Sequence, residues 1–137
     1  MRHPVVPLVL CTALLTLAGQ VAAAEPTLLL RQPTVSAEHL AFAYASDIWI
    51  ADRDGSDPRR LTVHEGLERD PQLSPDGLWV AFTGEYDGNV DVYAIPVAGG
   101  QPSRLTFHPY PDTVRGWTPD GDAVLFRSTR LGTNHHR

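Results

Sequence analysis

The sequence contains no lysine and a single cysteine, and each scarcity limits what the chain can do. All 11 basic residues are arginines, set against 16 acidic residues, for a formal net charge of −5. Because the arginines form no basic cluster along the sequence, nucleic acid is not an expected partner. The one cysteine, Cys11, lies in the first 24 residues, so the sequence beyond them offers no disulfide and no thiol chemistry.

The first 24 residues have the layout of a secretory signal peptide. Arg2 stands at the start, residues 5–17 are almost entirely apolar, and Ala22-Ala23-Ala24 supplies the small residues of a cleavage site. A permanent membrane anchor needs about 20 apolar residues, and the run at residues 5–17 is shorter than this. An uncleaved membrane anchor is therefore the less favoured alternative. We therefore predict cleavage before Glu25 and a periplasmic or secreted protein with no membrane contact. Loss of Arg2 would change the net charge from −5 to −6.

Beyond this segment, the sequence repeats itself at a spacing of 44 residues. Asp47 recurs as Asp91, and Arg60 recurs as Arg104. The other pairs at this spacing are Leu61-Thr62 with Leu105-Thr106, His64 with His108, Ser74-Pro75-Asp76-Gly77 with Thr118-Pro119-Asp120-Gly121, and Ala81-Phe82 with Leu125-Phe126. Several motifs that share one spacing indicate a structural repeat.

Each repeat has the composition of short strands joined by tight turns. Residues 78–83 and 91–97 are rich in β-branched and aromatic residues, as in buried strands. Residues 74–77 have the chemistry of a tight turn, and residues 98–100 that of a hairpin turn. Since no segment beyond the signal peptide keeps a helical apolar period, the fold is predicted to be all-β. Units of about 40–45 residues with several hairpins are typical of β-propeller blades, which are four-stranded antiparallel sheets.

The number of repeats is too small for a complete propeller. Residues 25–137 hold one unit near 33–73, one near 74–117 and a truncated one at 118–137. A closed ring needs about 4–8 blades, so we predict a partial propeller domain with an incomplete ring. A small β-sandwich is the alternative, but it would not repeat its turns and strands at one fixed spacing.

Two longer motifs are more specific than the turns. They are Gly84-Glu85-Tyr86-Asp87-Gly88-Asn89 and, after it, Gly116-Trp117-Thr118-Pro119-Asp120-Gly121. With residues 28–33, 42–49 and 104–109, they resemble the amino-terminal propeller of bacterial tricorn-protease homologues. The shorter Ser-Pro-Asp-Gly and Arg-Leu-Thr elements are also shared with TolB-type and prolyl-oligopeptidase propellers.

The resemblance implies that the chain is the N-terminal propeller segment of an exported tricorn-like serine peptidase. In that family, propellers are thought to gate or channel peptides to a catalytic domain, and this chain matches none of the catalytic positions. The implied partners are peptides or unfolded polypeptide, the remaining blades and the peptidase domain, with homo-oligomerisation of the parent protein. The alternative is a non-enzymatic, TolB-like periplasmic scaffold that binds envelope proteins.

No catalytic, cofactor-binding or metal-ligating residue is predicted within the chain. No serine lies in a Gly-x-Ser-x-Gly elbow, and Ser36 and Ser74 belong to turn sequences. His64-Glu65-Gly66-Leu67-Glu68 is similar to a zinc helix, but Glu68 replaces the second histidine and Gly66 disfavours a helix. His64 and His108 are repeat-equivalent, which favours a shared structural role. His135-His136 suggests only weak adventitious metal binding.

Two further sets of residues are interpreted as structural. Asp87, Asn89 and Asp91 match half of a calcium loop, but the loop's glycine and final glutamate are absent, so Asp87-Gly88 is predicted to form a hairpin turn with Asp91 starting the next strand. Large aromatic residues dominate packing between sheets. Trp49, Trp79 and Trp117 are therefore predicted to lie in the blade core, with Tyr93 equivalent to Trp49.

Overall fold

A computed structural model describes residues 30–130 of the chain, and within them it contains ten strands and no helix. The expected signal peptide and His135-His136 lie outside these residues. No helix in the described part of the chain is long and apolar enough to cross a membrane. The predicted all-β class is confirmed.

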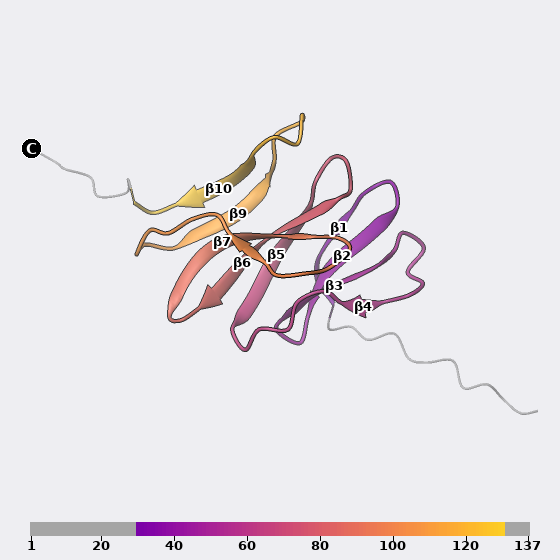
Figure 1. Cartoon of the computed structure of the whole chain (residues 1–137), viewed down its shortest axis with the longest axis horizontal. Helices are drawn as coiled ribbons and strands as arrows, with labels where there is room; N and C mark the ends of the chain where they lie inside the picture. The colour runs from indigo at the N-terminus through magenta and orange to yellow at the C-terminus, as the bar shows by residue number, and fades with distance from the viewer. Residues whose placement is uncertain (1–29, 131–137) are drawn as a thin grey trace, which may run out of the picture.

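The strands form three antiparallel sheets that follow one another in chain order (Figure 1). Each sheet is called a blade here. Blade 1 comprises β1 (Arg31–Val35), β2 (His39–Tyr44), β3 (Asp47–Asp52) and β4 (Arg59–Arg60). Blade 2 comprises β5 (Leu67–Leu73), β6 (Trp79–Tyr86), β7 (Asn89–Pro96) and β8 (Ser103–Arg104), and blade 3 has β9 (Asp112–Trp117) and β10 (Val124–Ser128). Within blades 1 and 2, the strands lie side by side in sequence order, as in the meander of a propeller blade.

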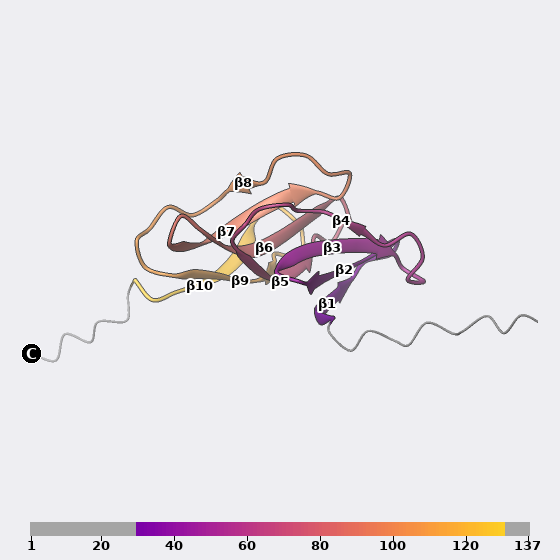
Figure 2. The same ribbon diagram turned by 90° about the horizontal axis from the view of Figure 1, so that it is seen from below.

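The first strands of the blades, β1, β5 and β9, lie next to one another: β5 contacts β1 on one side and β9 on the other. Figure 2 shows the blades from a second direction, with the short fourth strands β4 and β8 on the opposite side of the stack from β1 and β9. We call β1, β5 and β9 the inner strands. The predicted sequence unit 74–117 begins with β6 and ends with β9, whereas the sheet of blade 2 runs from β5 to β8. The boundaries of the sequence unit are therefore shifted by one strand from those of the blade. The described blades do not close a ring.

The core lies between consecutive blades. The small side chains of Ala41 and Ala43 in blade 1 face blade 2, where they pack against Phe82 and Tyr93. The remaining buried members of this cluster are Ile48, Ile50, Leu61, Val80, Ile95 and Val97. The opposite face of blade 2 presents Ala81 and Val92 to blade 3, in a second cluster completed by Val114, Trp117 and Val124. We call the face turned to the following blade the front and the other the back.

Strand register shows that the spacing between blades 1 and 2 is not constant. Trp49 and Tyr93 are 44 residues apart, but their cross-strand partners, Phe42 and Phe82, are only 40 apart. The β2–β3 hairpin is therefore four residues shorter than the β6–β7 hairpin. Further upstream, Arg31 pairs with Ala43 as Arg69 pairs with Thr83, so the inner strands of these two blades are equivalent at a spacing of 38.

Candidate functional site

An ion pair and a threonine hydroxyl fasten the fourth strand to the third in both four-stranded blades. In blade 2, Arg104 Nη2 lies 2.5 Å from Asp91 Oδ2, and Thr106 Oγ1 accepts the Val92 N–H at 3.0 Å. In blade 1, Arg60 Nη2 lies 2.8 Å from Asp47 Oδ1, and Thr62 Oγ1 accepts the Ile48 N–H at 2.9 Å. In both blades the third strand supplies the aspartate, the fourth strand the arginine and the segment after it the threonine. The repeated Asp and Arg-Leu-Thr motifs are therefore explained by their structural role within a blade.

Glu68 connects blade 2 to blade 1. Its carboxylate accepts the Ile48 N–H at 3.1 Å and the Thr62 hydroxyl from blade 1, and the Tyr86 hydroxyl from its own blade. The residue is only 1% exposed, and no arginine pairs with it among the described residues. Burial therefore raises the pKa of the Glu68 carboxyl, against the lowering effect of its hydrogen bonds. Residues 64–68 form no helix, because Leu67 and Glu68 belong to β5.

His64 has a structural role that its repeat-equivalent shares. His64 Nδ1 accepts the Gly66 N–H at 3.0 Å, and the ring stacks on Tyr86 with centroids 3.7 Å apart. His108 Nδ1 accepts the Tyr110 N–H at 3.1 Å. Among the described residues, no three His, Cys, Asp or Glu side chains gather as metal ligands do.

The serines lie in turns, and the half calcium motif lies in a hairpin. Ser74 Oγ donates to Asp76 Oδ1 at 2.5 Å, which lowers the pKa of the Asp76 carboxyl, and Ser36 Oγ accepts the His39 N–H at 3.0 Å. Asp87 and Gly88 both have positive φ, as a two-residue hairpin turn requires. One detail differs from prediction: the strand begins at Asn89, so Asp91 lies inside it and is fully buried.

The tryptophans differ in position. Trp117 packs between blades 2 and 3, and its Nε1 donates to the Gln72 carbonyl at 2.9 Å. Trp49 is half-buried beside Tyr44 on the back of blade 1, while its equivalent Tyr93 lies in the core. The core prediction is wrong for Trp79, which is 40% exposed because it begins β6 at the end of the sheet.

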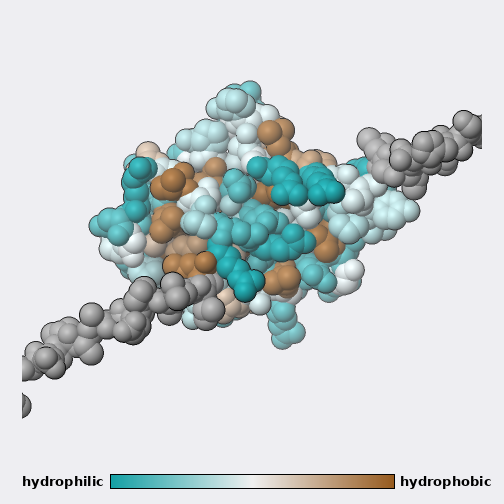
Figure 3. Space-filling view, turned by 180° about the vertical axis from the view of Figure 1, so that it is seen from behind, coloured by the Kyte–Doolittle hydropathy of each residue, from teal (hydrophilic) through white to brown (hydrophobic). Residues whose placement is uncertain are grey.

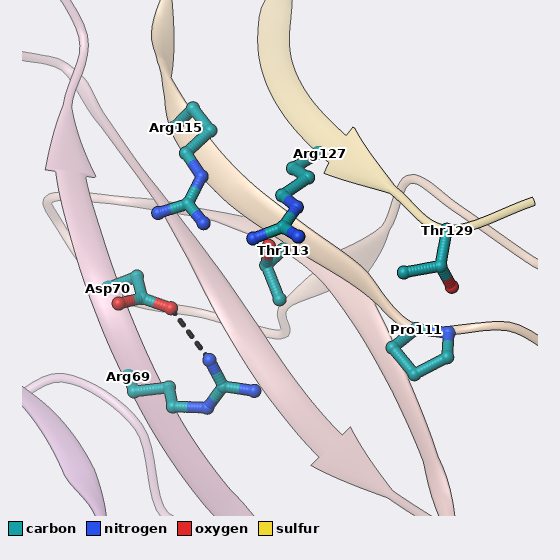
Figure 4. Close-up of a pocket in the computed structure, with 7 residues that line it drawn as sticks. All are labelled: Arg69, Asp70, Pro111, Thr113, Arg115, Arg127 and Thr129. Carbon is teal, nitrogen blue, oxygen red and sulfur yellow. Dashed lines mark hydrogen bonds and ion pairs between the residues drawn. The ribbon is translucent and has the colours of Figure 1, made fainter. Parts of the chain in front are cut away.

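Two clefts occupy equivalent places beside the inner strands. The first, of about 740 Å³, lies between blades 1 and 2 and is lined by Arg31, Gln32 and Arg69 among others. The second, of about 340 Å³, lies between blades 2 and 3 and is lined by Arg69, Asp70, Pro111, Thr113, Arg115, Arg127 and Thr129 (Figure 4). By strand register, Arg31 and Gln32 in the first cleft correspond to Arg69 and Asp70 in the second. The clefts are the candidate site, because each opens to the surface and has arginine side chains in its lining.

Sequence reasoning missed these clefts. The signal was present as Arg31-Gln32-Pro33 and Arg69-Asp70-Pro71, but it recurs at 38 residues and was hidden by the stronger spacing of 44. In the structure, Gln32 and Asp70 both have positive φ at a bulge. They also contact each other: Gln32 Oε1 accepts the Asp70 N–H at 2.9 Å.

Comparison with known proteins decides the family. The model of the tricorn protease N-terminal β-propeller domain matches residues 27–137. The chain belongs to this family. As a member, it is 42% identical over 101 residues to tricorn protease homolog 1 of Streptomyces coelicolor, covering 73% of this chain and 9% of that protein. It is 38% identical over 92 residues to putative tricorn protease homolog 2 of the same organism, covering 66% and 8%. This tricorn-type propeller chain thus spans less than a tenth of the length of these relatives.

Solved structures agree on the fold of this tricorn-type chain. The crystal structure of the tricorn protease superposes with a TM-score of 0.60 at 22% identity, over 68% of this chain and 10% of that one. TolB from Acinetobacter baumannii superposes with a TM-score of 0.66 at 27% identity, over 75% of this chain and 27% of that one. Both superpositions agree with the β-propeller fold that the family model describes.

Proposed function

We propose that the chain is the N-terminal propeller segment of an exported, tricorn-like serine peptidase, in which it gates or channels peptides toward a catalytic domain. The observation that carries the proposal is the family match over residues 27–137, supported by 42% identity to a tricorn protease homologue. The inner strands support a role in handling peptides, because two open clefts lined in part by arginines lie beside them. The signal-peptide layout of residues 1–24 supports export.

The test is peptidase activity of the whole protein as its host makes it. We expect hydrolysis of fluorogenic peptides that a serine-directed phosphonate abolishes, and we expect no hydrolysis by residues 25–137 alone. Mass spectrometry of the envelope fraction should find an N-terminus at Glu25. A protein that retains Met1, or a whole protein without peptidase activity, would contradict the corresponding half of the proposal.

A second function is favoured by one observation, the superposition on TolB at 27% identity. In that case the propeller is a non-enzymatic scaffold that binds envelope proteins. The two functions differ in the same assay, because a scaffold hydrolyses no peptide and reacts with no serine-directed phosphonate. Loss of envelope integrity on deletion of the gene, without a change in peptide degradation, would support the scaffold.

A further inference from the structure

The arginines of this acidic chain are unevenly distributed. Arg60, Arg104 and Arg130 form ion pairs with Asp47, Asp91 and Asp112, and Arg53 and Arg59 donate to backbone carbonyls. The other four described arginines line the two clefts: Arg31, Arg69, Arg115 and Arg127. Positive charge is therefore concentrated beside the inner strands, although the net charge of the chain is −5.

The cleft between blades 2 and 3 is the more positive of the two. Figure 4 shows the guanidinium groups of Arg115, from β9, and Arg127, from β10, extending toward Asp70 and Arg69 on β5. Arg115 and Arg127 are both exposed, and within residues 30–130 neither forms an ion pair or a hydrogen bond through its side chain. Three guanidinium groups thus surround one carboxylate, for a local formal charge of +2.

Asp70 is not free to neutralise the two unpaired arginines. Its Oδ2 accepts Arg69 Nη1 at 2.9 Å and the Thr83 hydroxyl at 3.2 Å. Its Oδ1 accepts Gln32 Nε2 at 2.5 Å. A carboxylate that already accepts three hydrogen bonds has little capacity left for a second guanidinium. Arg69 is held by this pair, whereas Arg115 and Arg127 are available to an outside acceptor.

We infer that this cleft binds carboxylate side chains of an acidic polypeptide segment, an inference that rests on the proposed peptide-handling function. A guanidinium group presents a planar fork of donors that matches a carboxylate in two parallel hydrogen bonds. Thr113 and Thr129 add hydroxyl groups to the same lining. The equivalent cleft at the neighbouring blade contributes Arg31, although apolar side chains line much of it. An extended segment lying across the inner strands would therefore meet arginines at both blades.

The lining favours an acidic peptide over a nucleic acid. Proteins that bind single-stranded nucleic acid combine basic residues with aromatic side chains on which the bases stack. The cleft at Arg115 and Arg127 is lined by arginine, aspartate, proline and threonine, with no aromatic residue among its described lining. It therefore offers charge and hydrogen bonds to an anion but no stacking surface to a base.

The experiment measures binding of fluorescent oligoglutamate, blocked at both ends, to the whole protein as its host makes it. The comparison peptide is blocked oligoglutamine of the same length. We expect tighter binding of oligoglutamate, a loss of about tenfold in the variant Arg115→Gln/Arg127→Gln, and weaker binding in about 0.3 M salt. Arg53→Gln, an arginine outside both clefts, is the matched control and should bind as the wild type does.

Each alternative outcome overturns the inference in a recognisable way. Equal affinity for oligoglutamate and oligoglutamine overturns it but leaves peptide handling intact, whereas no binding of any peptide overturns both. Tighter binding of oligothymidylate would indicate a nucleic acid site. Oligoglutamine with a free C-terminus binding as tightly as oligoglutamate would indicate recognition of a chain end. If the double variant does not fold, as judged by circular dichroism, the single exposed substitution Arg115→Gln decides the test.

Discussion

Glu68 and Asp112 occupy equivalent positions in successive blades, 44 residues apart, yet they meet different partners. Asp112 is fully buried and pairs with the Arg130 guanidinium. Glu68 meets only neutral donors, including the hydroxyl of Tyr86, which stands where Arg130 stands in blade 3. Burial raises the pKa of the Tyr86 hydroxyl, and the contact with Glu68 raises it further, so Tyr86 stays protonated and remains a donor. Asp112 is therefore held by an ion pair within blade 3, whereas Glu68 is held between blades 1 and 2 without a countercharge.

Glu68→Gln should change how stability depends on pH. Burial raises the pKa of the Glu68 carboxyl in the folded protein above its ordinary value of 4.5, so ionisation costs more in the folded state than in the unfolded state. Wild-type stability should accordingly fall, relative to Glu68→Gln, as the pH rises from about 4.5 through the raised pKa, and the difference should then stay constant. Thermal midpoints of the whole protein across this pH range measure the effect.

Glu65→Gln is the control for this substitution, because Glu65 is exposed and immediately upstream of the blade contact. Its thermal midpoint should follow the wild type at every pH. A parallel pH dependence of wild type and Glu68→Gln would show that Glu68 is not buried at the blade contact.

At the scale of elements, the segment joining β4 to β5 passes very close to the β6–β7 hairpin. A Cβ atom added at Gly66 would lie 2.0 Å from the Glu85 carbonyl oxygen and 2.8 Å from the Tyr86 ring. Only glycine allows the segment to approach this closely, and the approach positions His64 against Tyr86. The β4–β5 segment and the β6–β7 hairpin thus pack together beside the Glu68 carboxylate, which accepts the Tyr86 hydroxyl.

Gly66→Ala should destabilise the protein by about 3 kcal/mol or more, because the added methyl group meets backbone that cannot yield. The urea midpoint of the whole protein measures the loss. Gly88→Ala is the matched control: its φ of +80° makes alanine unfavourable, but no atom lies within 4 Å of the added Cβ, so it should cost only about 1–2 kcal/mol. Equal losses would mean that Gly66 does not approach Glu85 this closely.

The elements also show which features the sequence could predict. The repeat at 44 residues identified the Asp, Arg and Thr of blades 1 and 2 because both blades have the same length from the third strand onward. It could not reveal that Arg31 corresponds to Arg69, because the short β2–β3 hairpin changes the spacing. The contact of Glu68 with Thr62 depends on how two blades pack, which no local pattern contains.

At the scale of the whole molecule, blade 3 has only two strands among residues 30–130, and it covers less of blade 2 than blade 2 covers of blade 1. Leu61 is 7% exposed beneath blade 2, but its equivalent Leu105 is 44% exposed. Leu125 and Phe126, on β10, are 49% and 42% exposed. Figure 3 shows apolar patches among the hydrophilic side chains of one face of the described chain. In a repeat protein, such surface is normally covered by the adjacent repeat.

A polypeptide of residues 25–137 alone should aggregate or unfold without cooperativity. Each exposed large side chain forgoes about 1.5–3 kcal/mol of burial, against a typical domain stability of about 5–15 kcal/mol. The same residues within a complete ring should melt in one sharp transition, as followed by circular dichroism. A soluble monomer of residues 25–137 with a cooperative melt would contradict the prediction and indicate a self-sufficient small β-domain.

The contrast between the two faces of a blade gives the stack a polarity. Ala41 and Ala43 on the front of blade 1 lie against Phe82 and Tyr93 from the back of blade 2, beside the larger Ile48 and Ile50 of the same front. The front of one blade and the back of the next are therefore unlike surfaces that pack together, and two identical faces would not reproduce this packing. Each four-stranded blade carries both surfaces, so a copy added to the stack would meet its neighbour through the same kind of contact.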